Sequence, residues 1–404
     1  MLRSCRRRLL QATLPQVTTK LGYKNYVMSD ALAQMEMYCE SLKCAAPIRK
    51  RKVTVYGAGS DVGRIVTLCL KMQSAVKQLS LYDDVAKHHV IGVANDIAHI
   101  DTNCAVDAYQ GRTYLKKALT DADVVVICGG RYVMPPCCNI LDRDLFFQNL
   151  QHVRTAVIGC AMFAPNALIA VQTPPVDCNF TLCKYILDQY HIYNPKKLLG
   201  VNAVNSMRAG QMLATKANIQ AGDAHVPIVG GTGRVTRVPV YSGTTYFHCV
   251  SPEDYDCMIR LVREADDLIC CVKCNNEQGH LSIGYATARF ATNCLKGLYE
   301  KPTMAESALV EIEDPSSCYG LKYCSVPITI GDTGIVKYHI PKLNPPELEL
   351  LKDSQHDLED MLEMGRCNAV GDEYIENLPN PKQPCYIPMA CPVGTPCKNK
   401  ADAA

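Results

Sequence analysis

The chain of 404 residues lacks tryptophan, so tryptophan fluorescence is excluded as a probe of binding. It also lacks any apolar run as long as the ~18 residues that a membrane-spanning helix requires, and we expect no segment that crosses a bilayer. The net charge is only +2, which gives no electrostatic reason to expect nucleic acid as a partner. Cys271 and Cys274 have no second pair at zinc-finger spacing, and we expect no metal site.

The first 29 residues contain no acidic side chain. Their basic residues are Arg3, Arg6, Arg7, Arg8, Lys20 and Lys24. Such an arginine-rich, acid-free and partly amphipathic stretch is typical of a mitochondrial transit peptide, so we expect a location in the mitochondrial matrix. The simpler alternative is a basic tail without a targeting role.

Cysteine is abundant, with 23 residues spread along the chain. An odd number in a chain of this size, with a transit-like start, does not indicate the disulfide framework of a small secreted protein. We interpret most of these thiols as small buried apolar groups. The proportions of 48% apolar and 20% charged residues are ordinary for a globular protein, and the length is sufficient for two domains.

Short β-branched runs alternate with helical patterns in the first half of the chain. Strands are expected near residues 53–56, 79–84, 121–130 and 167–175. This alternation predicts a doubly wound parallel sheet of the Rossmann type, with helices on both faces. Beyond about residue 196 the pattern changes, with helices expected at 206–219, 251–269, 281–297 and 347–365, and strands within 226–240 and 323–340. This second pattern predicts an α+β domain.

Four segments follow from these patterns. They are an N-terminal extension (1–48), a nucleotide-binding domain (49–193), an α+β domain (194–365) and a proline- and cysteine-rich tail (366–404). The tail places Cys385, Cys391 and Cys397 among prolines, which suits an extended segment that presents its thiols outward. We expect either disulfide-linked or structural assembly through this tail, or a tail with ordinary thiols.

A glycine-rich turn follows the first expected strand. Gly57, Gly59 and Gly63 lie between that strand and a helical pattern, and Asp83 ends the next strand. In a dinucleotide-binding fold, the glycines let the backbone approach the pyrophosphate at the helix N-terminus, and the acid accepts hydrogen bonds from the adenosine ribose. The turn therefore predicts a dinucleotide site.

At this point the chain resembles the malate dehydrogenase family of the mitochondrial type. GAGSDVG is similar to the family's GAxGGxG turn, LSLYD to its LxLYD strand, and NDIAHID to its DLSHI segment. Further matches follow in family order: VVVICGG, RDLFFQN, YNPKKLLGV, RAG, VPIVGG and GYATARF. The resemblance runs from about residue 52 to 365. It implies a two-domain malate/lactate dehydrogenase-like fold, NAD as cofactor, malate and oxaloacetate as substrates, and a homodimer.

The glycine turn departs from the family pattern at two positions. Ser60 stands in place of the middle glycine, and Asp61 in place of the glycine after it. A carboxylate at this point opposes the binding of pyrophosphate through like-charge repulsion. We expect either that Asp61 caps the helix without a ligand, or that Arg64 partly compensates for its charge.

The catalytic positions of the family also carry other residues here. Oxidation of a 2-hydroxy acid needs a base, which in this family is a histidine supported by an aspartate. The resemblance places Thr232 at the histidine and Asn205 at the aspartate, whereas Arg208 keeps the arginine that binds the substrate carboxylate. His225 begins the preceding strand, and we interpret it as an ordinary histidine.

The remaining family contacts are only partly kept. In the mobile loop, Val133 and Asp142 fall at the two substrate-binding arginines, with Arg131 and Arg143 nearby. Pro174 and Asp177 fall at two asparagines of the family's NPVN segment. Asn149 keeps a position that contacts the cofactor.

Two functions therefore stay open. The first is a family member that has lost catalysis and has a structural or binding role. The alternative is an active or weakly active NAD-dependent malate dehydrogenase, or a related 2-hydroxy acid oxidoreductase.

Overall fold

The structure, a computed structural model, describes residues 51–132, 142–274 and 278–369. The expectations for residues 1–48, for Val133 and for the tail cysteines 385, 391 and 397 lie outside these ranges. Within them, no helix is both long and apolar enough to cross a membrane. No three His, Cys, Asp or Glu side chains of the described ranges are grouped so that they could hold a metal ion.

The first half of the described chain forms six parallel strands in the order β3-β2-β1-β4-β5-β6. They are β1 (Lys52–Tyr56), β2 (Gln78–Asp83), β3 (Ala105–Gln110), β4 (Val124–Ile127), β5 (Leu168–Val171) and β6 (Leu198–Val201). β1 and β4 are buried along their whole length, as expected for β-branched strands covered on both faces. The doubly wound architecture expected from the sequence is confirmed.

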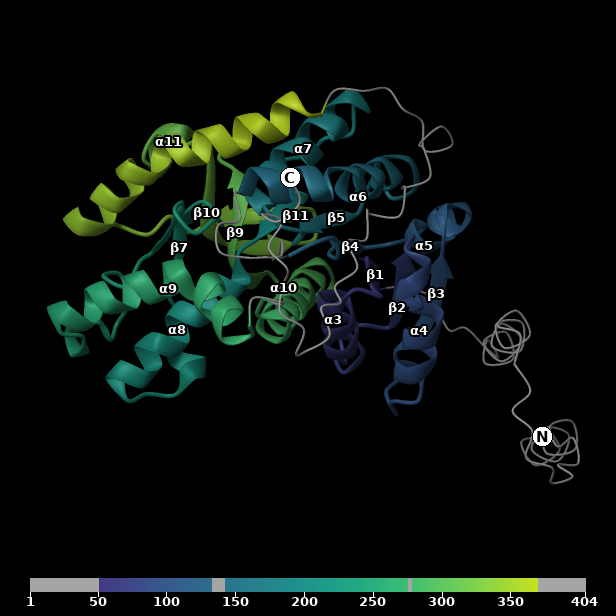
Figure 1. Ribbon diagram of the computed structural model, residues 1–404, viewed down its shortest axis with the longest axis horizontal. Coiled ribbons are helices and arrows are strands. Elements are labelled where there is room, and N and C mark those ends of the chain that lie inside the picture. Colours follow the sequence, from purple (N-terminus) through teal and green to yellow (C-terminus); the bar gives the residue numbers. More distant parts are fainter. Residues whose placement is uncertain (1–50, 133–141, 275–277, 370–404) are drawn as a thin grey trace, which may run out of the picture. The chain divides into compact units, whose positions relative to one another are not determined.

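Helices cover both faces of this sheet, as Figure 1 shows. The helices are α3 (Asp61–Lys71), α4 (Val90–Ala98), α5 (Leu115–Leu119), α6 (Asp142–Phe163) and α7 (Val176–Gln189), with short 3-10 turns η1 (Ala86–His88) and η2 (Arg112–Tyr114). One apolar core contains residues of α3 and α4, and the other contains residues of α5, α6 and α7. Successive residues of β4 alternate between the two cores: Val124 and Val126 belong to the first, Val125 and Ile127 to the second.

The second half is α+β, as expected. Its elements are α8 (Ala203–Ala217), η3 (Ala221–Asp223), β7 (Ile228–Gly230), β8 (Arg237–Pro239), η4 (Phe247–Cys249), α9 (Pro252–Val272), α10 (His280–Tyr299), β9 (Thr303–Glu311), η5 (Pro315–Cys318), β10 (Tyr323–Gly331), β11 (Gly334–Tyr338) and α11 (Pro345–Cys367). β9 pairs antiparallel with β6, so the antiparallel strands continue the parallel sheet. β7 and β8 form a hairpin whose turn contains Thr232.

Candidate functional site

The glycine turn after β1 is packed as tightly as a nucleotide turn requires. Gly57 has φ +84°, and a Cβ there would lie 2.0 Å from the carbonyl oxygen of Cys128. A Cβ on Gly63 would lie 2.1 Å from the carbonyl oxygen of Gly57. The amides of Gly57 and Ala58 both donate to the carbonyl oxygen of Tyr82 at the end of β2, at 2.8 and 3.0 Å. Only glycine fits at positions 57 and 63, and the turn holds the N-terminus of α3 beside β2.

Ser60 is the N-cap of α3. Its Oγ accepts a hydrogen bond from the amide of Gly63 at 3.1 Å and donates to the carbonyl oxygen of Gly57 at 2.7 Å. The expectation that Asp61 caps this helix is wrong, because Ser60 takes the extended backbone of the capping position and Asp61 is already helical. The largely exposed Asp61 carboxylate lies 3.9 Å from the Nδ1 atom of His280.

Asp83 lies at the end of β2 with its carboxylate already bonded within the chain. Oδ1 accepts from the amide of Val85 at 2.9 Å, and Oδ2 accepts from the amide of Gly59 at 3.0 Å. The Nδ1 atom of His88, in η1, is also 3.0 Å from Oδ2. Arg64 reaches the same segment, because its Nη2 lies 3.4 Å from the carbonyl oxygen of His88. Asp83 is only 1% exposed, whereas the side chain of His88, which is bonded to it, is 26% exposed.

The segment that follows β4 is packed against other parts of the chain. Tyr132 is 6% exposed, and its ring meets the ring of His280 edge-on at a centroid distance of 5.9 Å. Burial raises the pKa of Tyr132 well above its usual range. Asn149 is fully buried: its Oδ1 accepts from the Arg131 amide at 2.6 Å, and its Nδ2 donates to the carbonyl oxygens of Arg131 and Pro174. Asn149 therefore connects two backbone segments.

These contacts define how the chain fits NAD. The backbone of residues 57–63 has the shape of a pyrophosphate turn, and Asp83 stands where a ribose acceptor belongs. A carboxylate has about four acceptor positions, and three of those on Asp83 are used. About one remains for the two hydroxyl groups of a ribose. The turn and Asp83 suit the adenosine and pyrophosphate part of the dinucleotide, with His88 bonded to the acceptor; when bound, NAD would supply a hydride acceptor.

Thr232 is bonded to a carboxylate through both its backbone and its side chain. Its amide and its Oγ1 each donate to Oδ1 of Asp177 at 2.8 Å. Oδ2 of Asp177 accepts from the amide of Gly233 at 3.2 Å and from the Oγ1 of Thr236 at 3.1 Å. Asp177 is 1% exposed; burial raises its pKa, against the opposing effect of these hydrogen bonds. The turn of the β7–β8 hairpin is therefore built around Asp177.

Asn205 and Thr232 lie beside each other, as the resemblance implies for a catalytic pair. Nδ2 of Asn205 is 3.4 Å from the carbonyl oxygen of Thr232 and donates to Oδ1 of Asn202 at 2.6 Å. Oδ1 of Asn205 accepts from Nη1 of Arg208 at 3.2 Å and from Nη1 of Arg237. Both polar ends of the amide are used by neighbouring groups.

Asp266, on α9, bridges the two buried arginines. Its Oδ1 lies 2.8 Å from Nη2 of Arg208, and its Oδ2 lies 2.8 Å from Nη2 of Arg237. Burial alone would raise the pKa of Asp266, but Arg237 and Arg208 outweigh it and hold that pKa well below its usual range. Arg208, the predicted substrate-binding residue, is thus paired with a carboxylate of the chain.

A second acidic group faces the hairpin turn from the start of α6. If Gly233 carried a Cβ, Oδ2 of Asp142 would lie 3.7 Å from it and Oδ2 of Asp177 3.5 Å from it. Desolvation and the charge of Asp177 raise the pKa of Asp142 to about 6, although Arg237 and Arg234 act in the opposite direction. Two carboxylates therefore flank the turn that contains Thr232.

The other predicted residues lie elsewhere. The guanidinium carbon of Arg143 is 6.0 Å from the ring centroid of Phe147, on the first turns of α6. His225 is exposed ahead of β7, in keeping with an ordinary histidine. In the described part of the chain, no imidazole takes part in the hydrogen bonds that join Thr232, Asn205 and Arg208 to their neighbours.

Three residues of the site were missed from the sequence: His88, Arg237 and Asp266. Arg237 carried a weak signal, because a charged side chain interrupts the apolar run from Val235 to Tyr241. Neither His88 nor Asp266 belongs to a motif or a periodic pattern that would distinguish it.

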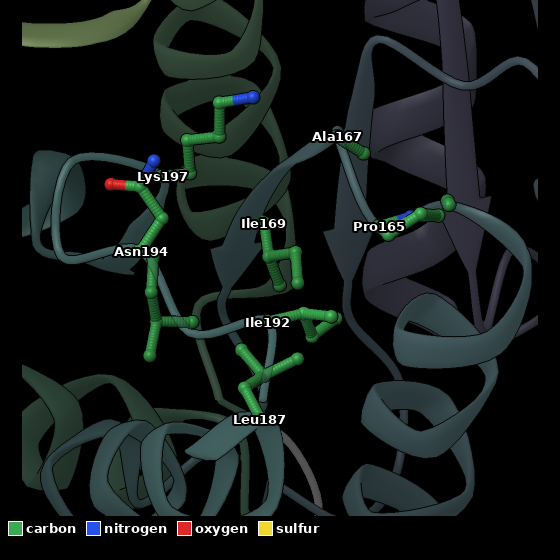
Figure 2. A pocket seen from close by; sticks show the side chains of 9 residues that line it. Pro165, Ala167, Ile169, Leu187, Ile192, Asn194 and Lys197 are labelled. Carbon is green, nitrogen blue, oxygen red and sulfur yellow. The ribbon is translucent and has the colours of Figure 1, made fainter. Parts of the chain in front are cut away.

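The hollows elsewhere contain none of the predicted site residues. The one in Figure 2 lies between β5, α7 and the segment before β6, and Ile169, Leu187 and Ile192 gather within it. Its volume of about 10 Å³ admits one water molecule at most. A larger groove of about 360 Å³ lies between α7, β10 and α11, with Tyr185, Tyr323 and Leu362 in its lining.

Comparison with known proteins extends the resemblance to nearly all of the described chain. Residues 51–200 match the lactate/malate dehydrogenase NAD binding domain, and residues 204–368 match the lactate/malate dehydrogenase alpha/beta C-terminal domain. The mitochondrial malate dehydrogenase of Felis catus is 29% identical over 328 residues, which is 81% of this chain and 92% of that protein. The mitochondrial malate dehydrogenase of Saccharomyces cerevisiae is 32% identical over 324 residues, or 78% and 92%.

Solved structures agree in fold. The apo malate dehydrogenase of Picrophilus torridus has a TM-score of 0.68 at 21% identity, covering 79% of this chain and 98% of that one. The lactate dehydrogenase of Eimeria maxima, with NADH and oxamate, has a TM-score of 0.67 at 18% identity, covering 82% and 99%. At these identities the likeness supports the fold alone.

Proposed function

This chain belongs to the lactate/malate dehydrogenase family, and we propose that it has lost the family's catalysis and has a structural or binding role. The observation that carries the proposal is the environment of Thr232, at the family's histidine position. Its hydroxyl and its amide are both bonded to the buried Asp177. The turn that should present a base is instead a closed polar network.

The chemistry of the pair at 205 and 232 explains why catalysis would fail. Transfer of a hydride from malate to NAD requires that a base take the hydroxyl proton. The hydroxyl of Thr232 does not take up a proton near neutral pH, and the amide of Asn205 cannot offset the charge of an imidazolium. Losing a general base costs roughly 10²–10⁴-fold in rate. The two losses are not multiplied, because the pair acts as a unit.

The charges around the turn also oppose the substrate. Malate and oxaloacetate carry two carboxylates, and Asp142 and Asp177 both flank the turn at Gly233. Arg208, which would bind one substrate carboxylate, is paired with Asp266 at 2.8 Å. An incoming dianion would compete with Asp266 for Arg208 while it approached two further acids, so substrate binding is disfavoured together with proton transfer.

A second candidate function rests on His280. Its ring lies beside Tyr132 at 5.9 Å, and its Nδ1 is 3.9 Å from the Asp61 carboxylate. A Cβ on the preceding Gly279 would lie 3.4 Å from Nη2 of Arg208. An imidazole near a carboxylate and next to the substrate arginine favours an oxidoreductase with a relocated base. Against it, Nδ1 is directed at α3 and not at the hairpin turn.

An NADH-oxidation assay with oxaloacetate separates the two candidates. The purified full chain is compared with His280→Gln, with Thr232→Val and with the double variant Asn205→Asp, Thr232→His. Typical enzymes turn over at about 1–10³ per second, and we expect the wild-type chain to fall below about 10⁻² per second. Turnover in the typical range would contradict the proposal. Activity that His280→Gln abolishes and Thr232→Val leaves intact would establish the second candidate.

Assembly and location complete the proposal. We propose a homodimer, as the resemblance to the malate dehydrogenase family implies. Sedimentation velocity tests this, and a monomer at all concentrations would contradict it.

The arginines among the first 29 residues support a mitochondrial location. A fluorescent fusion at the C-terminus, compared with a variant in which Arg3, Arg6, Arg7 and Arg8 are glutamine, tests that location.

A further inference from the structure

The segment η1 (Ala86–His88) packs directly on the glycine turn. The Nδ1 atom of His88 is 3.0 Å from Oδ2 of Asp83, and its backbone carbonyl oxygen accepts from Nη2 of Arg64 at 3.4 Å. The carbonyl oxygen of Ala86 accepts from Nε2 of Gln110 at 3.0 Å, at the end of β3. Side chains of β2, α3 and β3 therefore hold η1 next to Asp83, which is the ribose acceptor in a dinucleotide-binding fold.

We propose that His88 occupies the ribose subsite of this chain and that an adenosine ribose must displace it to bind. Oδ2 of Asp83 already accepts from the amide of Gly59 and is bonded to the His88 ring, so this oxygen has no acceptor position for a ribose hydroxyl. A ligand without ribose hydroxyls gains less from the displacement, because it donates no hydrogen bond to the vacated acceptor position. The inference concerns binding only and holds whether or not the chain is catalytic.

Gly59 is what allows His88 to take this place. A Cβ on Gly59 would lie 2.6 Å from the Cβ of His88 and 2.7 Å from its carbonyl oxygen, far inside van der Waals contact. Any other residue at position 59 would push η1 away from the turn. The absence of a side chain at position 59 therefore permits the contact with His88, in addition to the role in the turn that its place in the motif predicts.

Displacement of His88 would also change the charge that faces the pyrophosphate. Arg64 lies in the first turn of α3, next to Asp61, and its guanidinium is held at the carbonyl oxygen of His88. When η1 leaves, Arg64 loses this acceptor and becomes able to offset the repulsion between Asp61 and a phosphate. Both effects act in the same direction, so removing the contact should strengthen dinucleotide binding.

Binding of NADH, followed by the change in its own fluorescence, tests the proposal without activity. We expect His88→Ala to bind NADH about tenfold more tightly than the wild-type chain, which corresponds to about 1.4 kcal/mol. His89→Asn is the matched control, because residue 89 has φ +49°, which asparagine tolerates, and no bond to Asp83. Unchanged or weaker NADH binding in His88→Ala, with the control unchanged, would overturn the proposal.

A second pair of ligands locates the effect at the ribose. ADP and 2′,3′-dideoxy-ADP share the adenine and the phosphates and differ only in the hydroxyl groups that Asp83 would accept. Isothermal titration should show that His88→Ala improves the binding of ADP more than that of the dideoxy compound. An equal gain for both ligands would show that His88 acts only as a steric or electrostatic barrier, and it would refute its role at the ribose acceptor.

Discussion

Replacing Asp177 by alanine tests whether the hairpin turn at Thr232 is a structural network. The Asp177 carboxylate is 1% exposed and accepts hydrogen bonds from four donors. They are the amides of Thr232 and Gly233 and the hydroxyls of Thr232 and Thr236. The hydroxyls can rotate toward other acceptors, but the two amides cannot. The substitution therefore leaves at least one partly buried amide without its acceptor in the protein.

The magnitude follows from these groups. A buried donor without a partner costs about 1–3 kcal/mol, which gives roughly 2–6 kcal/mol for two amides. The amide of Gly233 keeps a contact with Oγ1 of Thr236 at 3.0 Å, and removal of a buried charge relieves some desolvation. We expect Asp177→Ala to lower the free energy of unfolding by about 3 kcal/mol.

Urea unfolding followed by far-UV circular dichroism measures this change without tryptophan. Asp188→Ala is the matched control: it lies on the same helix, is 39% exposed and pairs with Lys184 near the surface, so we expect a change within about 0.5 kcal/mol. A variant at position 177 as stable as the wild-type chain, or more stable, would refute the reasoning. It would mean that the carboxylate is kept at a cost in stability, as active-site groups often are.

Three further expectations concern the neighbouring charges and the tail. The pKa of Asp142 is about 6 in the folded chain and about 3.9 in the unfolded chain, so the folded state binds this proton more tightly. The free energy of unfolding should therefore fall as pH rises from about 4 to about 6. In urea unfolding measured across this pH range, Asp142→Asn should lack that decline. Asp266→Asn leaves Arg208 and Arg237 buried without a carboxylate and should lower the free energy of unfolding by about 3–5 kcal/mol. Added oxalate should restore part of the lost melting temperature. Equal stability of the variant and the wild-type chain would contradict this. Non-reducing gels should show disulfide-linked multimers that disappear when Cys385, Cys391 and Cys397 are changed to serine; monomer alone would end that proposal.

Local patterns in the sequence were sufficient for the architecture. β1 and β4 were expected because each is a short β-branched run followed by a glycine turn. β3, β6 and β9 were not expected: β3 is half exposed at the edge of the sheet, and no glycine turn follows β6 or β9. The structure therefore adds strands whose existence depends on their neighbours in the sheet.

The site was predictable only where a motif carries it. The glycines at 57 and 63 and the juxtaposition of Asn205 with Thr232 follow from motifs in family order. The partners of these residues could not be anticipated, because Asp266 reaches Arg208 from another helix and His88 reaches Asp83 from a loop. Asp61 was assigned a capping role that Ser60 has, since both residue types are good N-caps and only the backbone angles distinguish them.

A single-turnover experiment tests the loss of catalysis most directly. Protein in excess is first loaded with NADH, its occupancy is verified by NADH fluorescence, and oxaloacetate is then mixed in rapidly, so that neither weak cofactor binding nor product release conceals the chemical step. With Thr232 bonded to Asp177 and no base at the turn, we expect a rate constant for NADH oxidation below about 10⁻² per second. A rate constant of about 10 per second, the median for enzymes, would show that a group able to donate the proton to oxaloacetate exists at this site, and it would contradict the account.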